Sequence, residues 1–117
     1  MRNNRSFLVW FQNSKSIVVY KDNCYMSLVR GKRIIDLSRV IAGPYATMVL
    51  ADFGCEVIKI EPPEGDPTRQ WGPPWYEKES AYFMSINRNK RSLALNLKEP
   101  KCRDVLYKLV ARSDAVI

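Results

Sequence analysis

Hydrophobic residues after position 30 fall into short clusters separated by turn-forming residues. Four clusters are β-branched or alternate on a period of two, which predicts strands at residues 33–37, 56–61, 92–97 and 114–117. Between them lie three segments that predict helices. The first covers residues 45–53 behind Pro44, the second covers residues 79–87, and the third begins at Pro100 with an apolar stripe over residues 105–110.

The alternation of strands and helices predicts an α/β fold. A strand, a helix and a second strand within residues 33–61 form the unit of a parallel sheet, whose crossovers should be right-handed. Residues 62–76 contain five prolines, two glycines and three aromatic residues. We expect this stretch to be an ordered surface loop packed by its own side chains.

Length and composition limit the possible chemistry. The chain has 117 residues, of which 46% are hydrophobic, and this favours one globular domain. It has no histidine, so these residues alone cannot form a Ser-His-Asp triad or an imidazole metal site. Cys24, Cys55 and Cys102 form no CxxC motif, and we expect them to be reduced and structural. No run approaches the roughly 18–20 apolar residues of a membrane span.

Positive charge is concentrated at the start of the chain. The formal charge is +7, and residues 1–30 contribute five of the basic groups but only one acid. A basic segment poor in acids is typical of a mitochondrial targeting peptide. The alternatives are a non-homologous leader or an extra strand. We therefore divide the chain into a leader, residues 1–30, and a body, residues 31–117.

A second basic cluster lies within residues 88–103 and is either a solvated face or a phosphate-binding surface. Together with Trp71 and Trp75, whose rings could stack on bases, it permits a small nucleic-acid-binding module as the alternative function. The nearly balanced charge of residues 31–117 counts against that alternative. The cations of the cluster are Arg88, Lys90, Arg91, Lys98, Lys101 and Arg103.

The first strand-to-helix turn has a single glycine, Gly43, and therefore lacks the GxGxxG fingerprint of nicotinamide-binding domains. This disfavours a nicotinamide oxidoreductase. Asp36 ends a strand, where it could be functional or could cap its own turn. We expect Glu61, Glu64 and Asp66 to be solvated loop carboxylates.

Five blocks resemble the N-terminal part of the class III CoA-transferases, the formyl-CoA and carnitine CoA-transferase family. The blocks cover residues 36–47, 50–61, 65–69, 87–92 and 95–98 in the order and spacing of the family. The Trp-Gly-Pro-Pro loop at 71–74 and the Asn-Arg-Asn-Lys run at 87–90 look closest to its succinate–hydroxymethylglutarate (glutarate) branch. The resemblance extends over residues 31–117.

The resemblance implies a Rossmann-like parallel sheet domain, here truncated, from an enzyme that moves coenzyme A between carboxylic acids, including dicarboxylic ones. It implies an acyl-CoA thioester and a carboxylic acid as substrates, no tightly bound cofactor, an interlocked homodimer, and neither a nucleic-acid nor a membrane partner. Family members use an aspartate nucleophile that passes through a mixed anhydride to an aspartyl-CoA thioester. That aspartate would follow Ile117, so we expect no catalytic residue and no transferase activity in these 117 residues alone.

Several CoA-binding positions match the family. Val40 and Ile41 align with the loop that faces the thioester, where the formyl-CoA enzymes have glutamine in place of Ile41. Leu95 and Lys98 align with residues that line the adenine and phosphate site. The isoleucine implies an acyl group other than oxalyl or formyl, and the lysine matches the phosphates of CoA.

One nucleotide contact of the family is missing. Pro62 stands where the formyl-CoA enzymes have an arginine that contacts the nucleotide. Either a nearby cation replaces it, with Lys59 and Arg69 as the first candidates, or this contribution to affinity is lost. Arg91, in the second basic cluster, is a further candidate.

Overall fold

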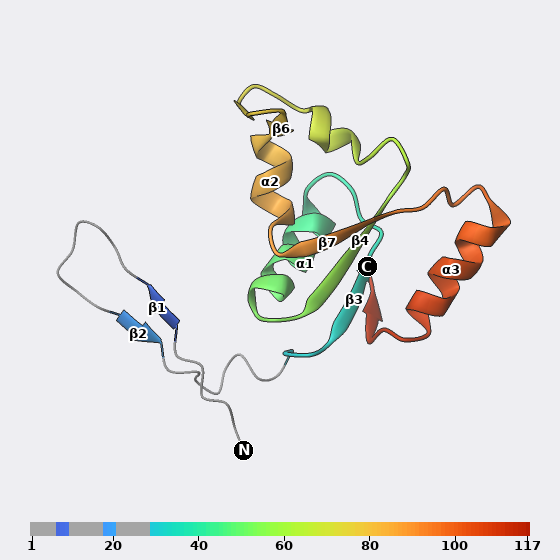
Figure 1. The fold of residues 1–117 in the computed structure, drawn as a ribbon, viewed down its shortest axis with the longest axis horizontal. Coiled ribbons are helices and arrows are strands. Elements are labelled where there is room, and N and C mark those ends of the chain that lie inside the picture. Colours follow the sequence, from blue (N-terminus) through green and yellow to red (C-terminus); the bar gives the residue numbers. More distant parts are fainter. Residues whose placement is uncertain (1–6, 10–17, 21–28) are drawn as a thin grey trace, which may run out of the picture.

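The computed structural model describes residues 7–9, 18–20 and 29–117 (Figure 1). Near the N-terminus, β1 (Phe7–Val9) pairs antiparallel with β2 (Val18–Tyr20). Most of residues 1–30, which we expect to be a targeting segment or leader, lie outside the described residues, and Cys24 does too.

Four parallel strands form the central sheet. They are β3 (Arg33–Asp36), β4 (Glu56–Glu61), β7 (Lys90–Ala94) and β8 (Ala115–Val116). Their order across the sheet is β7-β4-β3-β8, and all three neighbouring pairs are parallel. The predicted α/β fold with a parallel sheet is therefore confirmed. The chain first builds the sheet outward from β3 and then returns to add β8 on the other side of β3.

Helices cover both faces of this sheet. Helices α1 (Ala42–Asp52) and α2 (Ala81–Asn87) lie on one side, and α3 (Pro100–Val110) lies on the other (Figure 1). The reversal of strand order explains this arrangement. A right-handed crossover that moves in the opposite direction along a sheet must pass over the opposite face.

The segment between β4 and α2 contains more regular structure than the sequence predicts. It includes a short 3₁₀ helix (Pro67–Gln70) and a small hairpin of β5 (Trp75–Tyr76) and β6 (Glu79–Ser80). The side chain of Asp66 caps the 3₁₀ helix by accepting a hydrogen bond from the Thr68 amide. The predicted surface loop is therefore ordered, and part of it is regular secondary structure.

Several element boundaries differ from the predicted ones. Helix α1 begins at Ala42, so Pro44 occupies its third residue, where a missing amide hydrogen is tolerated in the first turn. Helix α2 begins only after Ser80, whose hydroxyl caps it. Strand β7 starts two residues earlier than predicted and ends at Ala94, because Lys90 and Arg91 already pair with β4.

Two hydrophobic clusters, one on each face, hold the layers together. Ile34 and Val57 pack with Ala51 of α1 and with Cys55. The α3-side cluster consists of Ile35, Ile60, Leu95 and Leu106, with Cys102 packed against it. Adjacent residues Ile34 and Ile35 face opposite clusters, as the period of two in a strand requires. Cys55 and Cys102 are free, as expected.

Replacing Ile35 tests the importance of the α3-side cluster. Ile35 is fully buried, so Ile35→Ala removes packed methyl groups and should lower the free energy of unfolding by about 2–5 kcal/mol. Val105→Ala on the exposed face of α3 should change it by less than about 0.5 kcal/mol. Urea denaturation followed by circular dichroism measures both. Equal effects of the two substitutions would contradict this assignment of the core.

Candidate functional site

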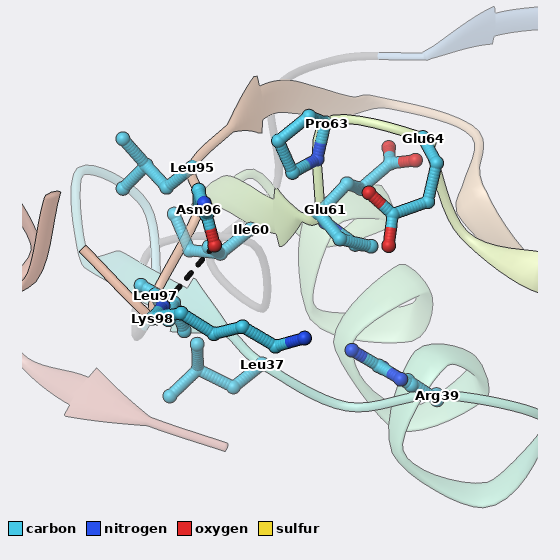
Figure 2. Close-up of a pocket in the computed structure, with 11 residues that line it drawn as sticks. Leu37, Arg39, Ile60, Glu61, Pro63, Glu64, Leu95, Asn96, Leu97 and Lys98 are labelled. Carbon is cyan, nitrogen blue, oxygen red and sulfur yellow. Dashed lines mark hydrogen bonds between the residues drawn. The ribbon is translucent and has the colours of Figure 1, made fainter.

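A cavity lies where the carboxyl ends of β3, β4 and β7 meet. Its volume is about 590 Å³, within the roughly 300–1,000 Å³ range of small-molecule sites. Three segments line it: Leu37 and Arg39 after β3, residues 60–64 at the end of β4, and residues 95–98 after β7 (Figure 2). The carboxyl edge of a parallel sheet is where α/β proteins bind ligands.

The cavity combines apolar walls with two cations. Leu37, Ile60 and Leu95 supply hydrocarbon surface, while Arg39 and Lys98 extend their charged ends into the space (Figure 2). Neither cation forms a salt bridge with any carboxylate in the described part of the chain. Such a cavity suits a ligand with both a flat apolar part and an anionic part.

The backbone at Lys98 is fixed from both sides. Its amide donates to Oδ1 of Asn96 at 3.2 Å, and its carbonyl accepts from the Arg103 guanidinium at 2.9 Å. Arg103 also donates to the Leu97 carbonyl at 3.0 Å. These bonds connect the end of β7 to the first turn of α3 and set the direction in which the Lys98 side chain leaves the chain.

The opposite face of the sheet carries a buried polar layer centred on Asp36. One carboxylate oxygen accepts from the Ser38 amide at 2.9 Å, and the other accepts from Thr47 Oγ1 at 2.7 Å and from Lys90 Nζ at 3.0 Å. Asp36 is fully buried and Lys90 nearly so. Asp36 therefore does cap its own turn, and it also neutralises a buried cation.

Both groups of this buried pair have shifted pKa values. Burial favours neutral Asp36, but hydrogen bonds from Ser38, Thr47 and Lys90 outweigh it and hold the pKa below its ordinary value. Burial lowers the pKa of Lys90, although its bond to Asp36 opposes that shift. Lys90 also donates to the Pro44 carbonyl and to Asn87 Oδ1, both at 2.8 Å. Its ammonium group therefore ties β3, α1 and α2 together.

Two further ion pairs continue the polar layer. Lys59 Nζ lies 2.8 Å from Asp66 Oδ2 and donates to the Ser38 carbonyl at 2.9 Å. Arg69 grips both oxygens of Glu61, at 2.8 and 2.9 Å. The expectation that Glu61 and Asp66 are solvated is wrong, since they are 3% and 4% exposed. They are buried because each meets a cation that the loop or strand brings to it.

Glu61 connects the polar layer to the cavity. Burial would raise the pKa of Glu61, but hydrogen bonds from Arg69, Ser92 and the Asp66 amide lower it to about 2. Ser92 Oγ donates to it at 2.7 Å. The side chain thus remains charged and occupied, and it has little capacity left to hold a ligand.

The turn between β3 and α1 is closely packed. A Cβ atom on Gly43 would overlap the side chain of Ser38, so only glycine fits there. Val40 adopts a positive φ of 69°, which is unfavourable for a β-branched residue, and its carbonyl accepts a hydrogen bond from Tyr82 Oη at 3.3 Å. The Tyr82 ring in turn lies 5.2 Å from that of Trp71, centroid to centroid.

The structure separates the seven predicted CoA-binding residues into three groups. Leu95 and Lys98 line the cavity. Val40 and Ile41 lie in the adjacent β3–α1 turn and are exposed. The other three engage carboxylates instead: Lys59 pairs with Asp66, Arg69 with Glu61, and Arg91 with Glu56 at 3.0 Å.

Sequence reasoning missed Arg39. It lies three residues beyond the end of β3 and next to the predicted Val40, so its position after a strand was the available signal. Only the three-dimensional structure shows that it shares a cavity with Lys98.

The second basic cluster is not one continuous cationic surface. Arg88 pairs with Asp52 at 2.6 Å, Arg91 pairs with Glu56, and Lys90 is buried. Trp71 and Trp75 are each about half exposed. Among the described residues, no group of histidine, cysteine or carboxylate side chains could hold a metal ion, and no helix is both long and apolar enough to cross a bilayer.

Residues 29–117 match the family model described as CoA-transferase family III. The chain belongs to this family. It is 52% identical to the mouse protein "Succinyl-CoA:glutarate CoA-transferase" over 93 residues, which cover 79% of this chain and 21% of that protein. It is 47% identical to "Succinate--glutarate CoA-transferase" of Agrobacterium fabrum over 94 residues, or 74% of this chain and 24% of the relative.

A solved structure agrees with the fold of this family III chain. The crystal structure of a CAIB/BAIF family protein from Brucella suis superposes with a TM-score of 0.72 at 41% identity, covering 76% of this chain and 25% of that one. The chain therefore spans about a fifth to a quarter of the proteins it matches. None of these comparisons supports the nucleic-acid-binding alternative.

The buried pair predicts a large cost for removing one partner. Lys90→Met leaves Asp36 as an uncompensated buried charge and should lower the free energy of unfolding by about 3–5 kcal/mol. Arg88→Ala breaks a surface pair and should cost at most about 1 kcal/mol. Urea denaturation at neutral pH compares them. If both variants unfolded at the same urea concentration, the polar layer would not have the stabilising role assigned to it.

Glu61 predicts a specific loss of stability in acid. Because its pKa falls from 4.5 to about 2 on folding, its contribution is complete above about pH 4.5 and disappears as the pH approaches 2. The contribution amounts to about 3 kcal/mol. Unfolding free energies measured across this range should fall less steeply for Glu61→Gln, which already lacks that contribution at neutral pH. The exposed control Glu99→Gln should follow the parent protein, and an unchanged slope in Glu61→Gln would refute the assignment.

Proposed function

We propose that this chain holds the nucleotide part of a coenzyme A thioester in the cavity at the carboxyl ends of β3, β4 and β7. The position of the Lys98 side chain in the cavity is the observation on which the proposal rests. Its ammonium group has no carboxylate partner among the described residues and projects into the cavity (Figure 2). Hydrogen bonds with Asn96 and Arg103 hold the backbone from which this side chain extends. The apolar side chain of Leu95 supplies a surface for the adenine ring.

The whole protein would move coenzyme A between dicarboxylic acids. The printed names of the mouse and Agrobacterium relatives specify succinyl and glutarate groups, and this chain is about half identical to each. Ile41, in place of the glutamine of formyl-CoA enzymes, fits an acyl group other than oxalyl or formyl. The resemblance assigns the nucleophile to an aspartate outside these residues, so the role proposed here is to bind the coenzyme and position its thioester near Val40 and Ile41.

The proposal extends to assembly and location. The resemblance implies an interlocked homodimer, and the exposed apolar side chains of Tyr107, Val116 and Ile117 give this chain surface to bury against another. The basic, acid-poor composition of residues 1–30 supports delivery to the mitochondrial matrix.

Binding of CoA tests the role of Lys98. Lys98→Ala removes a charge-assisted contact with phosphate and should raise the dissociation constant for CoA about tenfold or more. Lys108→Ala removes the same charge from the exposed far end of α3 and should leave the constant unchanged. Isothermal titration calorimetry on the 117-residue chain measures both. Equal affinities for the Lys98 and Lys108 variants would show that the cavity is not the nucleotide site.

A further inference from the structure

Arg39 lines the cavity together with Lys98. It is exposed, it lies in the turn after β3, and its guanidinium group points into the same space as Lys98 (Figure 2). These two cations converge and neither forms a salt bridge among the described residues, so they repel each other. The arrangement is therefore suited to an anion that contacts both.

The other cations near the polar layer are already engaged. Lys59 and Lys90 are buried against Asp66 and Asp36, and Arg69 grips Glu61. Each of these ammonium or guanidinium groups would have to break a bond of 3.0 Å or less to reach a ligand. Arg39 forms no salt bridge in the described ranges, so it can contact a ligand without breaking an ion pair.

The acidic residues of the cavity oppose an anion to different degrees. Glu61 is neutralised by Arg69. Glu64 is exposed, lies in the loop after β4, and forms no salt bridge among the described residues. Its carboxylate points toward the side of the cavity where Arg39 and Lys98 lie (Figure 2). A phosphate between the two cations would therefore feel one uncompensated negative charge.

We propose that Arg39 is the second phosphate-binding cation of this cavity and acts with Lys98 on one phosphate of the nucleotide. This inference rests on the proposed function and assigns a residue to it. A guanidinium group can bind two phosphate oxygens at once, whereas the ammonium of Lys98 acts as a single charge. Arg39 would thereby supply the positive charge that is missing at Pro62, which lines the same cavity.

The bound phosphate is either the 3′-monoester or the pyrophosphate of CoA, and two ligands distinguish these sources. Arg39→Ala should weaken CoA binding about tenfold. If Arg39 holds the 3′-phosphate, the variant should lose affinity for CoA but bind 3′-dephospho-CoA as tightly as the parent chain does. If it holds the pyrophosphate, the affinities for both ligands should fall by the same factor. Either result supports the proposal.

Three variants serve as controls and cross-checks. Arg112→Ala removes an exposed arginine that does not line the cavity and should bind CoA like the parent chain. Arg39→Gln keeps a polar side chain at this position without its charge and should lose about as much affinity as Arg39→Ala. Combining Arg39→Ala with Lys98→Ala should weaken binding by less than the product of the single effects, because the two groups share one phosphate.

The outcomes separate this inference from the proposed function. If Lys98→Ala loses affinity while Arg39→Ala and Arg39→Gln bind normally, the role of Arg39 is overturned and the CoA site stands. If the parent chain itself binds no CoA in calorimetry, both fail. Glu64→Gln should tighten binding about two- to fivefold by removing the opposing charge. An unchanged constant would overturn the placement of the phosphate among these three side chains.

Discussion

The surrounding fold depends on the position of the Lys90 ammonium group. It lies on an edge strand, reaches past the intervening strand β4, and ends beside Asp36 on β3, while also bonding to α1 and α2. A charge this deeply buried is tolerated only because every donor position has an acceptor. The same bonds fix where β3 ends and how the following turn leaves the sheet, and that turn carries Arg39, Val40 and Ile41.

The sheet separates two kinds of chemistry. One face near the strand ends carries the ion pairs of Asp36, Lys59 and Glu61, and within the described residues no buried side-chain nitrogen or oxygen is left without a partner. The other face supplies Ile60 and Leu95 to both the α3-side cluster and the cavity wall. This polar layer is satisfied without Arg39 or Lys98, and in the described part of the chain neither cation takes part in the ion pairs that link the strands and helices.

The amino-acid sequence predicts the strands and helices correctly where a local pattern of residues determines them. The β-branched run that contains Ile34 and Ile35 predicted a strand, and the family resemblance pointed to Leu95 and Lys98. The fates of Glu61 and Asp66 could not be predicted, because their burial depends on cations brought to them by the folding of other segments. The position of Arg39 in the cavity could not be predicted from the sequence for the same reason. Apart from Leu37, the other residues that line the cavity come from chain segments more than twenty residues away.

The close contact between Gly43 and Ser38 limits how this sequence can diverge. No side chain fits at position 43 while Ser38 keeps its place, and Ser38 is itself bonded to Asp36 through both its amide and its hydroxyl. A side chain at position 43 would displace Ser38, and loss of the Ser38 hydroxyl would remove a bond to Asp36, so a change at either position disturbs the buried carboxylate. Packing and hydrogen bonding thus couple positions 36, 38 and 43, and substitutions in the β3–α1 turn are better tolerated at its other positions.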